Sequence, residues 1–246
     1  MDRLVPTLAA LVLLGALTAG VLALAGVPGR AGPALAVLRA VLQLAAISFV
    51  LSGVITSIGW TALALAVMLG VASWTSARRL GGLHRWPVAA GAIAAGAGAA
   101  LVVVFATGAL EPSPRYLLAI GGITIGNAMA LTTLSGRRFL EAAGERWDEV
   151  EGWLALGARP VEATSGLARG AVRTALVPTI DQTRTTGLVT LPGAFVGAIF
   201  GGLPPLEAGR FQVLVLASIL AAGALAAVLA VRALAALDRR PGPASP

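Results

Sequence analysis

Hydrophobic residues fill long runs of this chain, and short groups of charged residues, glycines and prolines separate the runs. A helix that crosses a bilayer needs roughly 20 mainly apolar residues, each rising about 1.5 Å. At that length the pattern predicts seven membrane spans, at about residues 6–27, 33–52, 55–76, 86–110, 116–135, 186–202 and 206–234. We therefore expect an all-α fold, a polytopic membrane helix bundle of about seven transmembrane helices.

The sixth run differs from the others because it is short and rich in residues that interrupt helices. It contains Pro192, Gly193, Gly197, Gly201 and Gly202. A broken or half-length helix is therefore expected here. Such a segment is tolerated in a bilayer only where its backbone faces protein or water.

The stretch between the fifth and sixth runs has a different periodicity. Apolar residues recur there every three or four positions, as one stripe made of Phe139, Ala143, Trp147, Val150 and Leu154. We expect this stripe to pack on the membrane domain or on a partner. A break at 156–160 precedes a second predicted helix at 161–176, closed by Pro178, so the two helices form a helix-turn-helix elbow. A charged hairpin lying on lipid is the alternative.

Charge sets the elbow region apart from the rest of the chain. The whole sequence is 57% hydrophobic and 12% charged, with a mean hydropathy of +0.88, which is typical of an integral membrane protein. Residues 137–185 nevertheless hold 7 of the 18 basic residues and 7 of the 11 acidic ones, so their charges cancel. Balanced charge favours a folded docking surface over a lipid-attracted basic tail, and the surplus of +7 lies elsewhere.

Arginine-rich loops alternate with arginine-poor loops along the chain, which predicts its orientation. Positive residues stay on the cytoplasmic side of a membrane. In the inner (plasma) membrane, the amino end is therefore expected outside the cell and the carboxyl end in the cytoplasm. The first run is alternatively a signal peptide, since residues 23–25 resemble a cleavage site. The predicted organisation is spans one to five in 1–136, a cytoplasmic coupling segment in 137–185, spans six and seven in 186–236, and a disordered tail in 237–246.

Missing residue types exclude several chemistries. The chain has no cysteine, which rules out disulfides and thiolate metal sites. All 18 basic residues are arginines, so the chain lacks the lysine of a P-loop, and any ATP must be bound by another chain. The one histidine, His84, lies in a short basic loop, so an intramembrane Ser–His dyad or a histidine-rich metal site has no suitable residues. We expect no catalytic residue, no cofactor on this chain and no nucleic-acid partner.

A run at the turn of the elbow resembles the coupling-loop signature of ABC transporter permeases. In that signature a glutamate precedes a glycine by six residues, and Glu151 and Gly157 have this spacing. Further matching runs include Gly126-Asn127-Ala128-Met129, residues 178–193 and residues 201–212. Together they resemble the UPF0014 family of FetB-type permeases of iron-exporting ABC transporters, which also includes plant aluminium-tolerance permeases. The resemblance covers about residues 34–232.

This resemblance implies a permease that works as a homodimer with a separate, FetA-like ATPase subunit carrying ATP and Mg²⁺. The elbow would insert into a groove on the ATPase and transmit its closure to the spans. The residues that the resemblance assigns to this coupling are Glu151, Leu156, Gly157, Ala158, Pro160 and Glu162. Export of iron, another metal or a small solute is implied in the same way.

Polar residues inside the predicted spans are candidates for a transport pathway, because polar side chains in lipid tend to face the bundle interior. They are Gln43, Ser48, Asn127, Thr132 and Gln212, with Met129 as a soft ligand nearby. Hydrogen bonding between helices is the alternative role for each. The family pattern Met-Met-Thr-Gly-Gln is replaced here by residues 194–198, Ala-Phe-Val-Gly-Ala, so no metal ligands are assigned.

Candidate gating residues flank the sixth run. They are Asp181, Arg184, Pro192, Gly193 and Glu207. Asp181 and Arg184 are three residues apart, so a local ion pair is the alternative to a gate. A secondary transporter is the rival class of function, but it would need a coupling carboxylate near the membrane midplane, and the spans offer none.

Overall fold

The structure, a computed structural model, describes residues 4–29, 31–54, 56–237 and 240–241, and the side chains of residues 4, 49–52 and 54 lie outside that description. Every regular element within the described residues is a helix, which confirms the all-α prediction. The chain divides into two compact units, Met1–Thr56 and Ser57–Pro246, and each unit is described by itself.

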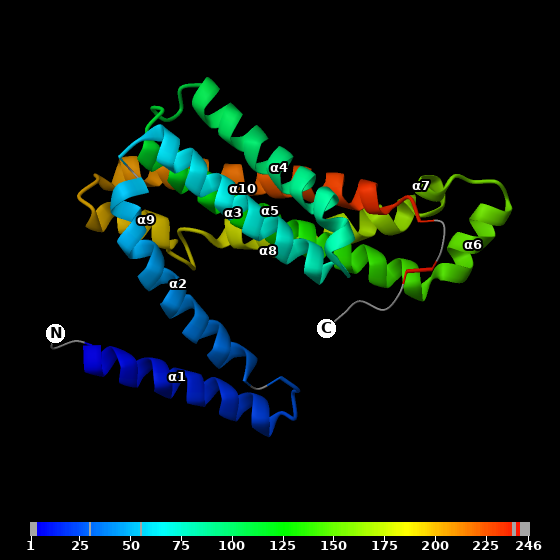
Figure 1. Cartoon of the computed structure of the whole chain (residues 1–246), viewed down its shortest axis with the longest axis horizontal. Helices are drawn as coiled ribbons and strands as arrows, with labels where there is room; N and C mark the ends of the chain where they lie inside the picture. The colour runs from blue at the N-terminus through cyan, green and yellow to red at the C-terminus, as the bar shows by residue number, and fades with distance from the viewer. Residues whose placement is uncertain (1–3, 30, 55, 238–239, 242–246) are drawn as a thin grey trace. The chain divides into compact units, whose positions relative to one another are not determined.

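The N-terminal unit is a pair of helices, α1 (Leu4–Leu24) and α2 (Gly32–Val54), which contact each other (Figure 1). Nearly all of their described side chains are exposed, although almost all of them are apolar. Apolar residues around the whole circumference of a helix are typical of a lipid-facing element. Gln43 and Ser48 lie on α2, and the Ser48 hydroxyl donates to the carbonyl of Leu44 at 2.7 Å.

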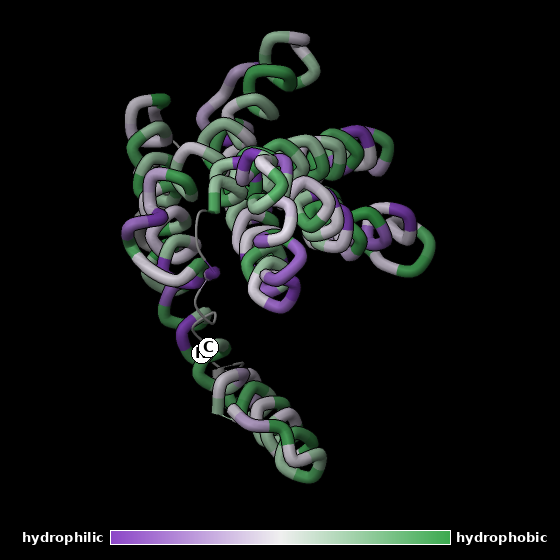
Figure 2. Tube along the Cα trace, turned by 90° about the vertical axis from the view of Figure 1, so that its right-hand side faces the viewer, coloured by the Kyte–Doolittle hydropathy of each residue, from purple (hydrophilic) through white to green (hydrophobic). Residues whose placement is uncertain are grey.

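The C-terminal unit is a bundle built around two long helices, α5 (Pro114–Glu145) and α10 (Pro205–Leu234). α3 (Ile58–Arg79), the short 3-10 helix η1 (Leu83–Arg85) and α4 (Trp86–Ala106) cover one side of this pair, and α8 (Ser165–Thr185) also packs along it. Figure 2 shows hydrophobic residues dominating the helices, with hydrophilic residues gathered in patches. The architecture therefore matches a polytopic membrane bundle.

Glycine permits the closest helix contacts in this bundle. A Cβ atom at Gly96 would overlap the carbonyl oxygen of Ala222, and one at Gly223 would overlap a methyl group of Leu131. Such small residues allow helix backbones to approach closely in membranes, where packing replaces the hydrophobic effect as the main attraction. α10 is therefore fixed against α4 on one side and α5 on the other.

Five described segments are long and apolar enough to cross a bilayer, and they agree with five of the seven predicted spans. They are Val5–Leu24, Ile58–Arg79, Leu83–Ala106, Pro114–Glu145 and Pro205–Leu234. The predicted second span corresponds to α2, whose apolar described part, Gly32–Ser48, is shorter. The predicted sixth span is not one continuous helix: α9 (Gly193–Phe200) is about 12 Å long, against a hydrocarbon core of about 30 Å.

The elbow region differs from its prediction in two respects. α5 runs on to Glu145, so Phe139 and Ala143 belong to the fifth span's own helix, and α6 (Trp147–Ala155) begins after a break at Arg146. The second predicted helix is split into α7 (Pro160–Ala163) and α8, and Pro178 lies inside α8. The prediction that Pro178 ends this helix was wrong because neighbouring helices hold α8 in place. Ala171 and Ala175 of α8 are buried against α5 and α10.

Candidate functional site

The predicted apolar stripe packs against the bundle, as expected. Phe139, Ala143 and Val150 are almost completely buried, and Trp147 and Leu154 pack against the same cluster. The cluster also contains Leu167 and Ala171 of α8, and Leu80, Val231, Leu234 and Ala235 from the ends of α3 and α10. The stripe therefore joins the elbow to the helices that carry the membrane crossings.

One hydrogen bond ties the elbow directly to α10. Thr164, between α7 and α8, has no exposed surface, and its single hydroxyl proton is shared between the carbonyls of Pro160 at 2.9 Å and Ala235 at 3.1 Å. Because the carbonyls of the last helical turn lack partners within the helix, this hydroxyl satisfies one of them. A displacement of the elbow would therefore be transmitted to the end of α10.

A glycine with positive φ forms the turn of the elbow. Gly157 has φ of 90°, a conformation that other residues adopt only with strain, and its N–H donates to Leu154 at 3.0 Å to close α6. Space around it is open, because no atom lies within 4 Å of a Cβ built there. This turn is free for close approach by another chain, as the resemblance to a coupling loop implies.

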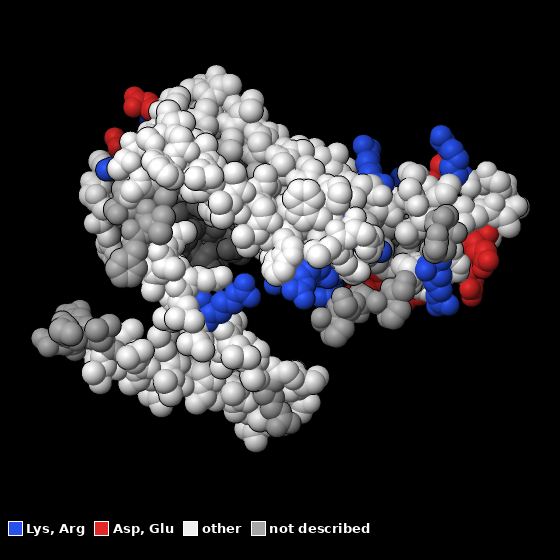
Figure 3. Space-filling model, viewed as in Figure 1, with Lys and Arg blue, Asp and Glu red and all other residues white. Residues whose placement is uncertain are grey.

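Apolar side chains are exposed on both sides of this turn. Leu156 is 82% exposed and Trp153 is 51% exposed, and Val161 on α7 is also exposed. Glu151 is exposed on the same short helix as Trp153, and Ala158 and Pro160 follow the glycine. Figure 3 shows acidic and basic side chains around this end of the unit, over α6 and α7. An apolar tip with a charged border is typical of a protein-binding surface.

Glu162 is already engaged by a residue of its own chain. Its carboxylate accepts from the backbone N–H of Arg159 at 3.0 Å and from the Arg159 guanidinium at 2.6 and 3.1 Å. The side-chain hydrogen bond to Arg159 is the main reason that the pKa of Glu162 is lowered, followed by the backbone bond, and the same pair raises the pKa of Arg159. This capping box fixes the start of α7 after the turn.

A pocket lies where α8 ends and α9 begins. It has a volume of about 490 Å³ and is bounded by α8, the connecting segment, α9 and the first half of α10. Its lining is mainly apolar, with three polar side chains, Thr183, Thr186 and Gln212. Gly187, with φ of 88°, turns the connecting segment and donates to the Thr190 carbonyl at 2.8 Å.

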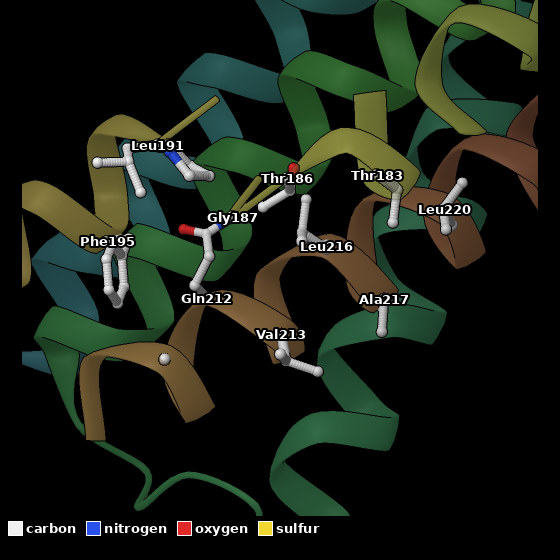
Figure 4. A pocket seen from close by; sticks show the side chains of 12 residues that line it. Thr183, Thr186, Gly187, Leu191, Phe195, Gln212, Val213, Leu216, Ala217 and Leu220 are labelled. Atoms are coloured by element: carbon white, nitrogen blue, oxygen red, sulfur yellow. The ribbon is translucent and has the colours of Figure 1, made fainter. Parts of the chain in front are cut away.

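Gln212 is the pocket residue with a buried polar atom that lacks a partner among the described residues. Its side chain projects from α10 toward the pocket, near Phe195 of α9 (Figure 4). The residue is 6% exposed, and its Oε1 is buried without a hydrogen-bond partner in the described part of the chain. A buried acceptor without a partner is costly and points to a ligand, water or moving group that supplies a donor. Broken helices around a small pocket are also a common setting for substrate sites in transporters.

The structure places the other predicted pathway residues elsewhere. Met129 packs with the cluster between α3, α4, α5 and α10, and the Asn127 amide donates to the carbonyl of Ile123 at 2.9 Å. Thr132 is fully buried, and its hydroxyl oxygen lacks a partner in the described residues. None of these three lines the pocket, so only Gln212 of the predicted pathway set on this unit does so.

The predicted gating residues lie near the break or at the start of α10. Pro192 lines the pocket and directly precedes α9, whose first residue is Gly193. Arg184 Nη1 donates to Asp181 Oδ1 at 3.4 Å, and both side chains are exposed. Glu207 lies in the first turn of α10, where a negative charge is favoured by the helix dipole. No cluster of three or more acidic or histidine residues that could hold a metal occurs in the described chain.

Thr183, Thr186 and Phe195 line the pocket, but the sequence pattern did not single them out. The predicted sixth span began at residue 186, which put Thr183 outside the membrane. The threonine-rich run at 179–190 before Pro192 was the available signal, because hydroxyl groups can satisfy the backbone of an interrupted membrane helix.

A protein-family model described as "Uncharacterised protein family (UPF0014)" matches residues 5–237. The chain belongs to the UPF0014 family. It is 37% identical to "UPF0014 membrane protein STAR2" of Oryza sativa subsp. japonica over 79% of this chain and 69% of that protein. It is 34% identical to "Protein ALUMINUM SENSITIVE 3" of Arabidopsis thaliana, over 77% of this chain and 71% of that one.

A bacterial relative carries a functional name. The chain is 32% identical to "Probable iron export permease protein FetB" of Escherichia coli strain K12, over 78% of this chain and 75% of that protein. No solved structure matches the chain. This UPF0014 member is therefore a multi-pass membrane protein whose relatives are named as membrane proteins and permeases rather than enzymes.

Proposed function

We propose that this UPF0014 protein is the permease subunit of an ABC transporter, driven by a separate, FetA-like ATPase subunit that binds ATP and Mg²⁺. Two copies of the chain would form the membrane part, in the plasma membrane with the amino end outside and the carboxyl end in the cytoplasm. The cargo would be iron, another metal or a small solute, which leaves the cell. Similarity to the FetB permease supports this class of function.

The elbow is the observation that carries the proposal. In the structure the elbow consists of α6, α7 and the turn between them. Its tip exposes Leu156 and Trp153 to solvent, yet its base is buried against α8 and α10, and Thr164 bonds it to α10. Exposed apolar groups favour binding of a partner, and a buried, bonded base transmits the partner's movement. A charged hairpin that lies on lipid would have no need of the link to α10.

The pocket at the α8–α9 break is the proposed cargo site, with Gln212 as its polar contact. Gln212 lies in its mainly apolar wall, and the buried Oε1 of this side chain has no hydrogen-bond partner among the described residues. Thr183 and Thr186 also line the pocket, and their hydroxyls donate to the backbone carbonyls of Thr179 and Gln182, each at 2.8 Å, so each hydroxyl can still accept a hydrogen bond. A cargo with hydrogen-bond donors or a complexed cation would suit this lining.

Co-purification with a FetA-like ATPase tests the proposal. Leu156→Ala should reduce ATPase capture at least several-fold, whereas Leu206→Ala should leave it unchanged. These leucines are matched, because Leu156 is 82% exposed at the elbow and Leu206 is 80% exposed at the start of α10. Failure of the wild-type chain to capture any ATPase, or equal capture by both variants, would contradict the coupling role and favour a secondary transporter.

A further inference from the structure

One stripe runs along the exposed face of α8, which also carries Arg169, Thr174, Pro178, Gln182 and Thr185 to its sides. Its members are spaced by three or four residues and are all exposed: Gly166, Gly170, Arg173, Val177, Asp181 and Arg184. Residues at this spacing share one side of a helix. The opposite side, with Leu167, Ala171 and Ala175, is buried in the bundle. The stripe is therefore the surface that α8 turns away from its own unit.

α8 packs beside the apolar length of α10, one of the helices long enough to cross a bilayer. Its start is bonded to the end of α10 through Thr164 and Ala235, and Ala175 packs with Leu131 of α5 and Ala227 of α10. Further along α8, Thr183 shares the pocket with Leu216 and Leu220 of α10. α8 thus runs antiparallel to α10, from the C-terminal end of α10 to near the midpoint of α10.

This register places two charges near the middle of the bilayer, which departs from the predicted cytoplasmic location of residues 137–185 and from the prediction that no carboxylate lies near the midplane. The uncharged run of α10 extends from Phe211 to Val231, and Thr183 lies beside the centre of that run. Arg184 follows Thr183 directly, and Asp181 precedes it by two residues. Their side chains are 74% and 59% exposed. The two residues form an ion pair within the chain at 3.4 Å. Ionisable groups at such depth face protein or water rather than lipid, so this part of the stripe faces a second protein surface or a water-filled space.

We infer that a second copy of this chain covers the stripe, with α8 of each copy beside the two-fold axis. This inference rests on the proposed function only in that the permease works as a pair. An axis along the membrane normal puts equal residues at equal depth. Three residues of helix rise about 4.5 Å, so Asp181 of each copy lies within reach of Arg184 of the partner subunit. The surface is self-complementary in charge.

The rest of the stripe suits the same arrangement. At Gly166 and Gly170 a Cβ atom would have no other atom within 4 Å, which leaves room for a helix to approach closely. Arg173 lies nearer the cytoplasmic end of α8, where its long, flexible side chain can extend its charged group into water. The N-terminal unit is poorly suited to neutralise the stripe, because the first 56 residues contain a single acidic residue, Asp2, at their very start.

Two crossed ion pairs on the axis would also form a gate. They lie one turn or less from Thr183 and Thr186, which line the pocket at the α8–α9 break. Separation of the two α8 helices would break both pairs and open that depth to water. The elbow adjoins the start of α8, so movement of the elbow is the natural cause of such a separation.

Disulfide cross-linking tests the inference without any ATPase. The chain has no cysteine, so single-cysteine variants need no background substitution. Gly170→Cys and Val177→Cys should each form a covalent dimer when membranes containing the full chain are oxidised. Val102→Cys is the control, since Val102 is 66% exposed on α4, which packs on α3, α5 and α10. It should remain monomeric, and absence of dimers from both stripe variants would overturn the inference.

A charge exchange separates pairing between copies from pairing within one copy. In the Val177→Cys background, Asp181→Arg alone and Arg184→Asp alone should each lower the cross-linked fraction at least several-fold. Co-expression of the two variants, with different tags, should restore a mixed dimer, because each arginine then faces a carboxylate of the partner subunit. If the mixture is no better than the single variants, the ion pairs do not cross the interface. Cross-linking without ATPase capture would instead contradict only the ATPase-coupling part of the proposed function.

Discussion

Gly157 is the residue on which the elbow's shape most depends. With φ of 90°, it adopts a backbone conformation that glycine reaches without a steric cost. Gly157→Ala should therefore cost about 1 kcal/mol of stability and lower partner-stimulated ATPase activity. Gly152→Ala is the matched control, since Gly152 lies within α6, has negative φ and has open space around it. Thermal unfolding together with ATPase rates measures both effects, and equal behaviour of the two variants would contradict a special role for the turn.

Two side-chain oxygens among the described residues are buried without a hydrogen-bond partner, one on Gln212 beside the pocket and one on Thr132 away from it. Gln212→Leu removes an unpartnered acceptor, so stability should stay the same or rise by about 1 kcal/mol, while transport is lost. Thr132→Val removes the other unpartnered oxygen, which lies outside the pocket, and should leave transport intact. Transport assays in vesicles, with thermal unfolding beside them, measure both. Normal transport by Gln212→Leu would remove Gln212 from the pathway.

The ion pair between Arg159 and Glu162 in the capping box leads to a prediction about the pKa of Glu162. The folded-state pKa of Glu162 is lowered, mainly by its hydrogen bond to the Arg159 side chain. A lowered carboxyl pKa contributes stability above the unfolded pKa, about 4.3, and that contribution is lost as pH falls through the folded pKa. Arg159→Ala should raise the pKa of Glu162, which carboxyl NMR titration would measure. Because the pair is exposed, the effect on overall stability should be small.

At the scale of elements, the sequence predicted the helices whose signals are local. Apolar length indicated five of the crossings, and the spacing of Phe139, Val150 and Leu154 indicated the buried side of the elbow. The helix end predicted at Pro178 was wrong, because packing of α8 on α5 and α10 outweighed the tendency of proline to end a helix. The glycines and prolines of the sixth span predicted its break, but the pocket was not predictable, because it depends on the register of α8 along α10.

The bond between Thr164 and α10 provides a test of transmission from the elbow. Thr164→Val keeps the shape of the side chain but leaves the Ala235 carbonyl without this donor, in a buried site. A loss of about 1–3 kcal/mol in stability is expected from the unsatisfied carbonyl. ATPase capture should persist while cargo transport falls, because binding at the tip no longer moves α10 as directly. Thr174→Val is the control, since the exposed Thr174 hydroxyl bonds only within α8, to Gly170.

At the scale of the whole molecule, three features of one bundle would act together. The elbow would receive movement from an ATPase, α8 would carry it along α10, and the α8–α9 break would hold the cargo. The family model shows the family, while the proposed path of movement is inferred from packing. The pairing of copies through α8 could not be foreseen from the sequence, because the depth of Asp181 and Arg184 follows only from tertiary contacts.

ATP hydrolysis by the assembled transporter tests the central claim most directly. The chain and its FetA-like partner would be reconstituted together in lipid vesicles, and the ATPase rate measured with and without iron salts or other small solutes. We predict that the permease raises the rate, that one cargo raises it further, and that Glu151→Arg combined with Gly157→Trp abolishes both increases. An ATPase rate that is unaffected by the permease, or by the double substitution, would contradict the claim that this chain is the membrane subunit of an ABC transporter.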